Sequence, residues 1–358
     1  MQVDGAAQSQ SVVKLDNYRF SGLDSSLVGA LKSVADYYEL PLTSSWIYGM
    51  TGHAFLHVLV ESMDEPNGGP PVPEVLRLMH NTGLDIEGIH IHAEGEAFTQ
   101  LQAQAWDIAR QAIAAGQPVF AKNIDIRNQF SVVYAYDDIG YYRYNWHTGY
   151  EHSEDVIPWN QLGLSLCPCI HCTNSRQSSS TVESDAVTVT DCPRGLISLH
   201  WGRPNQQTAN DSEAFKQALE FVIERNEKGS YEWAGKTYLV GAQAYERWLT
   251  ALTDGRLNRY YFSLFIEILN EARSHALRFL SEMRERLTEV SCLALIDELT
   301  PIYTEVADNY AMLKDAYPYT EPPEHEVKKS EWCAAALSRI MTLERAALNK
   351  LRELHSVL

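Results

Sequence analysis

The sequence is poor in basic residues, in cysteine and in long apolar runs, and each shortage excludes a class of protein. Lys and Arg together number 29 against 47 Asp and Glu, which gives a formal net charge of −18. The chain therefore has no basic face for a nucleic-acid backbone. Six cysteines in 358 residues are too few for a disulfide scaffold. No run of about 18 uncharged apolar residues occurs, so we expect no membrane partner.

The start of the chain also lacks a targeting pattern. Its first 20 residues contain no basic stretch followed by an apolar one, which a secretory signal needs. Because sparse cysteine fits a reducing compartment, we expect a cytoplasmic protein. Hydrophobic residues make up 45% of the chain, enough to fill one large core or two ordinary ones. We expect no cofactor.

The apolar pattern changes character near residue 206. Before that point, residues 25–38 and 52–62 have helical spacing, while residues 129–145 alternate in the manner of an antiparallel hairpin. Beyond it, the periodic segments have the spacing of amphipathic helices. We therefore predict an α+β domain with an antiparallel sheet over residues 1–205 and an α-helical bundle domain over residues 206–358.

The region from Gly22 to Phe55 has the sequence pattern that surrounds the nucleophile in a cysteine enzyme, yet it contains no cysteine. A thiol at the start of the helix predicted over residues 25–38 would have a lowered pKa and would be a reactive thiolate. Serine stands there instead, at Ser25 and Ser26. The helix runs into "DYYELPL" and is followed by "IYGMTGHAF", and "GQPV" and "QFSVVYAYDD" come later in the chain.

These segments resemble the papain-like superfamily of cysteine peptidases and acyltransferases, and within it the family of the butirosin biosynthesis protein H N-terminal domain. The resemblance covers roughly residues 15–199 and implies a papain-like, cysteine-proteinase-like fold. It aligns the family's catalytic Cys with Ser26, or with Ser25 if the register slips by one. The catalytic His falls at Gln129 and the third triad residue at Asn145. The resemblance also implies acyl chemistry on a small amine or a carrier-bound acyl group.

A triad of Ser26, Gln129 and Asn145 has no general base, because glutamine cannot take a proton. Loss of the base costs on the order of 10⁴-fold in rate. We therefore favour a degenerate site, a pseudoenzyme that binds a small molecule or a partner in bacterial secondary metabolism or peptide modification. The alternative is an acyltransferase or amidohydrolase with Ser26 as nucleophile and a base elsewhere. Ser25 and Ser26 also suit plain helix capping, or a role in binding.

Four further side chains are candidate binding residues. His53 and His57 lie one turn apart on the helix predicted over residues 52–62, where they fit a relocated base, a metal-binding pair or ordinary buried histidines. Tyr245 and Trp248 share one face of a predicted helix, which either lines an interdomain ligand cleft or packs against the first domain.

Two segments concentrate residue types that bind metals. The first fits a zinc site, a disulfide or buried strand cysteines, and it contains Cys167, Cys169, His171 and Cys172. The second puts its ligating groups on one face of a strand, which fits a cation site or a solvated edge strand, and it contains His90, His92, Glu94 and Glu96.

The C-terminal segment "ALSRIMTLERAALNKLREL" is amphipathic. Its apolar side pairs either within its own bundle or with a second subunit. A homo-oligomer through the C-terminal helices is therefore a candidate partner, beside a small-molecule or acyl-group ligand.

Overall fold

The structure, a computed structural model, describes residues 12–63, 68–144, 156–164, 193–206, 209–319 and 331–358. It contains an antiparallel sheet and a helical C-terminal region, which confirms the predicted α+β class. By its internal contacts the chain divides into two compact units. The first comprises Met1–Ser21, Asp36–Glu39 and Glu87–Arg203, and the second comprises Gly22–Ala35, Leu40–Ile86 and Pro204–Leu358.

The first unit is built on a seven-stranded sheet with the order β3-β8-β4-β5-β6-β7, in which β1 also pairs with β5. β4 runs antiparallel to both β5 and β8. β5 runs antiparallel to β6, which confirms the predicted hairpin. The strands are β1 (Val13–Lys14), β3 (Leu84–Glu94), β4 (Val119–Lys122), β5 (Phe130–Tyr136), β6 (Gly140–Tyr144), β7 (Ile157–Pro158) and β8 (Arg194–Pro204).

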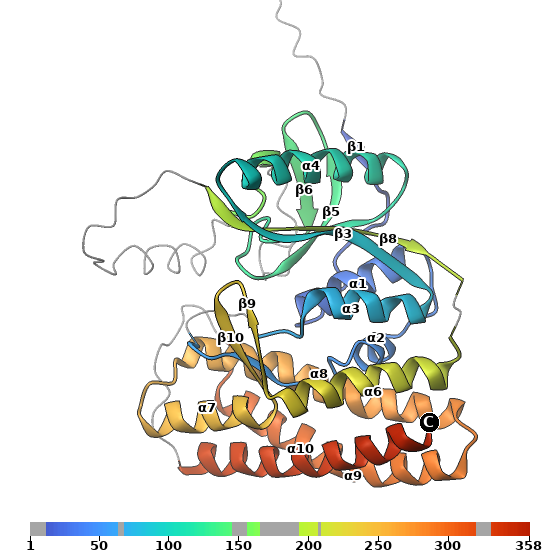
Figure 1. Ribbon diagram of the computed structural model, residues 1–358, viewed down its shortest axis with the longest axis vertical. Helices are drawn as coiled ribbons and strands as arrows, with labels where there is room; N and C mark the ends of the chain where they lie inside the picture. The colour runs from blue at the N-terminus through green and yellow to red at the C-terminus, as the bar shows by residue number, and fades with distance from the viewer. Residues whose placement is uncertain (1–11, 64–67, 145–155, 165–192, 207–208, 320–330) are drawn as a thin grey trace, which may run out of the picture. The chain divides into compact units, whose positions relative to one another are not determined.

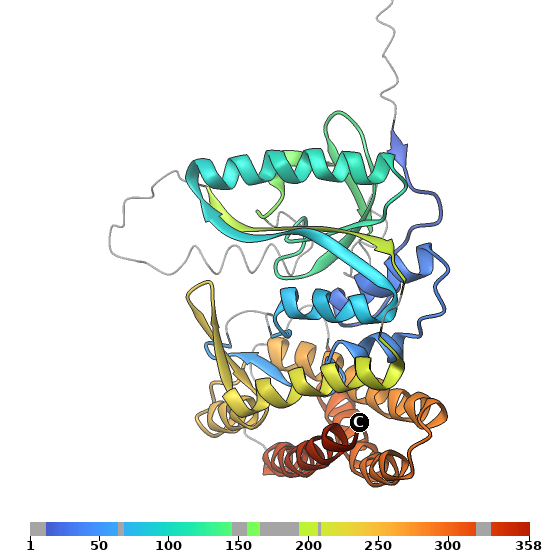
Figure 2. The ribbon, with the colours of Figure 1, turned by 45° about the vertical axis from the view of Figure 1, so that its right-hand side comes forward.

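Helix α4 (Gly95–Ala114) covers one face of this sheet (Figures 1 and 2). Its buried Trp106 meets the rings of Tyr136 and Tyr141 edge-on, with centroids 5.8 and 5.0 Å away. Because the helix begins at Gly95, with φ of +62°, Glu96 lies on it. The expectation that Glu96 continues the strand face of His90 and His92 is therefore wrong.

Long helices make up most of the second unit. α8 and α9 lie side by side, and α10 packs against α9 (Figures 1 and 2). The side-chain oxygen of Asn258 accepts from the Tyr261 N–H at 3.2 Å and so caps α8. The helical character predicted for the C-terminal half is confirmed by α6 (Asp211–Lys228), α7 (Ala242–Thr253), α8 (Arg259–Arg286), α9 (Val290–Ala316) and α10 (Glu331–Val357).

One strand pair interrupts the helices of the C-terminal half. β9 (Ser230–Trp233) and β10 (Lys236–Val240) form a hairpin. Its two turn residues, Ala234 and Gly235, have φ of +49° and +74°, as a two-residue hairpin turn requires. The predicted α-helical domain over residues 206–358 did not include this strand pair, whose segments "SYEW" and "KTYLV" lie between the predicted helices.

The helix predicted over residues 52–62 is absent. α2 (Ser44–Met50) lies earlier, because the Thr43 hydroxyl caps it by accepting from the Trp46 N–H at 2.9 Å. Residues Val58–Val60 form β2, which pairs antiparallel with β10. His53 and His57 are therefore not on a common helix.

Two further helices are α1 (Ser26–Tyr37) and α3 (Val72–Met79). α1 matches the helix predicted at residues 25–38, and its residues up to Ala35 belong to the second unit. No helix among the described residues is long and apolar enough to cross a membrane.

The division into domains 1–205 and 206–358 stays a prediction. Within the second unit, α2 packs on α8. A Cβ atom on Gly49 would lie 2.2 Å from Cγ of Phe279, so only glycine lets the ring approach this closely. The Thr43 hydroxyl also donates to the Glu282 carboxylate at 2.8 Å.

Candidate functional site

Helix α1 begins at Ser26, the position that the resemblance aligns with a nucleophile. The carbonyl of Ser25 accepts from the Gly29 N–H at 2.8 Å, so Ser25 occupies the N-cap position of the helix. Ser25 is 9% exposed and Ser26 is 7% exposed. Both serines are thus buried at a helix end that carries partial positive charge.

A carboxylate of the same unit binds the free amides at this helix end. Oε2 of Glu271, on α8, accepts from the backbone N–H of Asp24 at 2.8 Å and from that of Ser25 at 3.2 Å. The hydroxyl of Tyr48, on α2, donates to the same oxygen. Hydrogen bonds to an ionised acceptor are about twice as strong as neutral ones. The charge of Glu271 therefore stabilises the start of α1 and opposes a second negative charge beside it.

Asp24 stands beside this carboxylate. Burial first, and then the negative charges of Glu271 and Glu267, raise the pKa of Asp24 to about 6, while Lys314 opposes them. Lys314 forms its own ion pair with Glu267 at 2.5 Å. The cluster thus holds a carboxyl group that titrates near neutral pH.

Two histidines of the second unit bind hydroxyl groups on or beside α2. Nδ1 of His275 lies 2.9 Å from Oγ of Ser45, and its ring stacks on Tyr48 with centroids 4.6 Å apart. Nδ1 of His53 lies 3.0 Å from Oγ1 of Thr51. Burial and then the charge of Arg278 lower the pKa of His275 to about 4, and burial lowers that of His53 to about 3. Both imidazoles are neutral at pH 7.

Sequence reasoning missed the pair of Ser45 and His275. The two residues are 230 positions apart, so no local spacing connects them. The only local signal was Ser45 itself, two residues after the α2 cap in "TSSW".

Three of the predicted binding residues lie together in the core of the second unit. The ring of His57 lies 4.4 Å from those of both Tyr245 and Trp248, centroid to centroid. Tyr245 and Trp248 are each 1% exposed. The hydroxyls of Tyr245 and Tyr310 lie 2.5 Å apart. These three side chains therefore pack against one another inside the second unit.

A buried arginine lies next to that cluster. Arg273, on α8, is 0% exposed and pairs through Nε with the Glu344 carboxylate of α10 at 2.5 Å. Its Nη1 donates to the carbonyls of Ala54 and Leu56 at 3.1 and 3.2 Å. Burial and then this charge lower the pKa of His57. Arg273 thus connects the segment after α2 to two long helices, and its charge adds to burial in lowering the pKa of His57.

Of the other two aligned positions, the structure describes Gln129. It belongs to the first unit, where it is 5% exposed and its carbonyl accepts from the Asn123 N–H at 3.2 Å. Asn145 lies outside the described residues. Neither unit by itself holds more than one of the three aligned positions among its described residues.

The face of the sheet in the first unit also carries a serine between two imidazoles. Oγ of Ser198 lies 2.9 Å from Nδ1 of His90 and 3.1 Å from Nε2 of His200. Because the hydroxyl has one proton, one ring donates to it and the other accepts from it. Burial first, and then Lys122 for His90 or His90 for His200, lowers the pKa of each ring to about 3. His90 is therefore one of two neutral histidines that share hydrogen bonds with the Ser198 hydroxyl.

Of the two candidate metal segments, the one with His90, His92, Glu94 and Glu96 lies within the described residues. Across the described ranges, no group of three or more His, Cys, Asp or Glu side chains converges in the manner of a metal site. The thiol-rich segment lies outside the described residues, and with it Cys167, Cys169, His171 and Cys172.

No family model matches the chain, and no curated protein matches its sequence.

Proposed function

We propose that this protein is a non-catalytic binding module on a papain-like frame. Its occupant is a small molecule, an acyl group or a partner in bacterial secondary metabolism or peptide modification. The observation that carries the proposal is the carboxylate of Glu271 at the start of α1, on the amides of Asp24 and Ser25.

A cysteine enzyme of this kind needs a thiolate, and three differences oppose one here. Ser26 replaces the thiol, and a hydroxyl is far less acidic than a thiol. Gln129 replaces the imidazole and cannot take a proton. Glu271 adds a negative charge near the helix end, where a catalytic site needs a positive potential. All three changes favour a neutral, uncharged hydroxyl at Ser26.

The second candidate is acyl transfer or amide hydrolysis by a serine, for which the sequence pointed to Ser26. One observation favours it, the distance of 2.9 Å between Oγ of Ser45 and Nδ1 of His275. That distance suits a nucleophile and its base. The low pKa of His275 makes it a weak base, however.

Intact-mass spectrometry separates the two candidates. The full chain is incubated with a fluorophosphonate and with an acyl thioester, beside Ser26→Ala and Ser45→Ala variants. The binding module predicts no adduct on any of the three proteins. An adduct that only Ser26→Ala abolishes supports the nucleophile aligned by the resemblance, and one that only Ser45→Ala abolishes supports the pair with His275.

A second experiment tests the papain-like alignment itself. We expect the double variant Ser26→Cys with Gln129→His to react faster with iodoacetamide than Ser26→Cys alone, because the added imidazole stabilises the thiolate. Equal rates in two folded variants would contradict the alignment of these two positions. Native mass spectrometry of the unmodified protein as isolated reports whether it retains a small-molecule ligand.

A further inference from the structure

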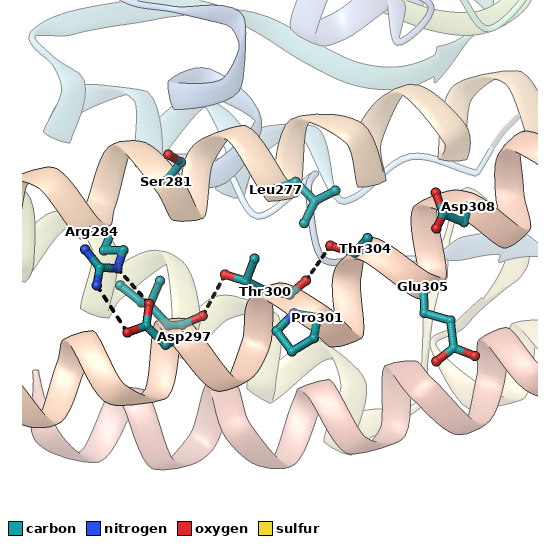
Figure 3. Close-up of a pocket in the computed structure, with 10 residues that line it drawn as sticks. Leu277, Ser281, Arg284, Asp297, Thr300, Pro301, Thr304, Glu305 and Asp308 are labelled. Atoms are coloured by element: carbon teal, nitrogen blue, oxygen red, sulfur yellow. Dashed lines mark hydrogen bonds and ion pairs between the residues drawn. The ribbon is translucent and has the colours of Figure 1, made fainter.

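A groove of about 580 Å³ lies between α8 and α9 in the second unit (Figure 3). The volume falls in the range of pockets that hold small organic molecules. Residues from two facing helix stripes line the groove: Leu277, Ser281 and Arg284 from α8, and Ile296, Asp297, Thr300, Pro301, Thr304, Glu305 and Asp308 from α9.

Part of the lining is apolar. Leu277 points from α8 toward α9 (Figure 3), and Ile296 and Pro301 line the α9 side. Ile296 is 0% exposed and forms the floor of the groove, so the apolar surface open to a ligand is that of Leu277 and Pro301. Burial of a ligand's hydrocarbon part against these two side chains is favourable by about 25 cal/mol for each Å² removed from water. The groove can therefore hold an apolar body.

The polar lining consists largely of acceptors. The hydroxyls of Thr300 and Thr304 donate to the carbonyls of Ile296 and Thr300, at 2.8 and 2.9 Å. Their protons are therefore engaged, and only their oxygen lone pairs remain. Proline has no N–H, so Pro301 leaves the carbonyl of Asp297 without its helical donor.

The one cationic side chain in the groove is already paired. Arg284 donates from Nε and Nη2 to the two carboxylate oxygens of Asp297, at 2.7 and 3.2 Å. This pair engages two of the five guanidinium N–H groups and balances the charge of Arg284. Apart from Arg284, Ser281 is the lining side chain with a hydroxyl proton to offer. The other polar lining atoms are acceptors, so a ligand that supplies donors matches most of this lining.

The charges of the lining favour a cation. Glu305 pairs with Arg339 of α10 at 2.6 Å, and Asp297 pairs with Arg284. Asp308 is the lining carboxylate for which the described residues supply no cationic partner. The net charge of −18 also attracts cations to the molecule and repels anions.

We propose that this groove binds a small organic amine in its ammonium form. The ammonium lies at Asp308, and the hydrocarbon part lies against Leu277 and Pro301. An ammonium group has three donors and no acceptor, which complements an acceptor-rich lining. The site lies apart from the start of α1, so it stands whether or not the proposed function holds.

The test is an NMR titration of the full, methyl-labelled chain at pH 7. The probe is 2-phenylethylamine, and the matched neutral ligand is 2-phenylethanol. We expect the amine to shift the methyl signals of Leu277, Ile296 and Thr300, and to bind more tightly than the alcohol. Because an exposed ion pair is screened by salt, the preference should shrink at high ionic strength.

Variants of the lining test where the ammonium and the hydrocarbon part of the ligand bind. Asp308→Asn should weaken amine binding about three- to fivefold, as expected for an exposed ion pair. Asp315→Asn removes the same charge from the exposed end of α9, outside the groove, and should leave binding unchanged. Ser281→Trp should fill the groove and abolish the shifts. Equal binding of amine and alcohol, equal effects of the two Asp variants, or shifts that map elsewhere would overturn the proposal.

Discussion

The carboxylate of Glu271 binds the backbone of Asp24 and repels its side-chain carboxylate. Its Oε2 accepts a hydrogen bond from the Asp24 backbone N–H at 2.8 Å. Burial, followed by the negative charge of the same carboxylate, raises the pKa of the Asp24 side chain to about 6. The start of α1 is thus fixed by a strong hydrogen-bond acceptor at a cost in like-charge repulsion, an arrangement that suits structure better than thiolate chemistry.

Removal of the Glu271 carboxylate should destabilise the protein. Glu271→Ala leaves the N–H groups of Asp24 and Ser25 and the hydroxyl of Tyr48 without their shared acceptor. We expect a loss of about 2–4 kcal/mol in the free energy of unfolding, measured by urea titration. Glu285→Ala, at the exposed end of the same helix, should change it by no more than about 0.5 kcal/mol. If Glu271→Ala lost no more stability than Glu285→Ala, the three hydrogen bonds to Glu271 would not contribute to stability.

Neutralisation of Asp24 should stabilise the protein at neutral pH and not in acid. A carboxyl whose pKa is raised from 3.8 to about 6 on folding binds more protons in the folded state, so stability falls as pH rises through that window. Asp24→Asn mimics the protonated form and keeps the backbone N–H. We expect a gain of about 1–3 kcal/mol at pH 7.5 and little change at pH 3.5. A variant less stable than the parent at pH 7.5 would contradict this account of the charge.

The buried histidines should make the protein sensitive to acid. A histidine whose pKa is lowered on folding takes up its proton only in the unfolded state, so stability falls as pH drops below about 6.5. Each contributes a slope of about 1.4 kcal/mol per pH unit. Those with lowered pKa among the described residues are His53, His57, His90, His200 and His275.

His57 offers a clean variant for this test. His57→Phe keeps a ring between Tyr245 and Trp248 and removes the titration. Its unfolding free energy should fall less steeply between pH 6.5 and 4.5 than that of the parent, by one proton. Parallel curves for the parent and the variant would exclude a buried neutral His57.

The packing of α2 on α8 predicts a specific clash. Gly49→Ala puts a methyl group 2.2 Å from Cγ of Phe279 and should cost about 3 kcal/mol or more. The double variant with Phe279→Leu should lose less than the sum of the two single losses, because the smaller side chain relieves the clash. Gly69→Ala meets open space and should be nearly neutral. Additive losses would contradict this contact.

Local patterns predicted much of the secondary structure. The apolar repeat from Leu27 to Ala35 gave α1, and the alternation on either side of Asp137 gave the hairpin of β5 and β6. Both depend on neighbours within a few residues. The segment around Val58 was predicted wrongly, because its strand exists only through pairing with β10, whose partner residue Val240 lies far along the chain.

The surroundings of the candidate site were beyond sequence reasoning. Glu271 follows Ser25 by 246 residues and His275 follows Ser45 by 230. Neither pair has a spacing rule, since a bundle brings helices together through apolar faces that do not specify which polar side chains will meet. Alignment to a catalytic pattern identified Ser26, and only the fold revealed which charge stands beside it.

The most direct test of the central claim is the thiol pKa of a Ser26→Cys variant, measured by ultraviolet difference titration against the parent. In a catalytic helix N-terminus, a thiol pKa drops well below its usual value of about 8.5. Here the charge of Glu271 and the burial of position 26 predict a pKa at or above 8.5, which should fall when Glu271→Gln is added. A pKa below about 7 in the single variant would show that the site still favours a thiolate, and would contradict the account of a degenerate site.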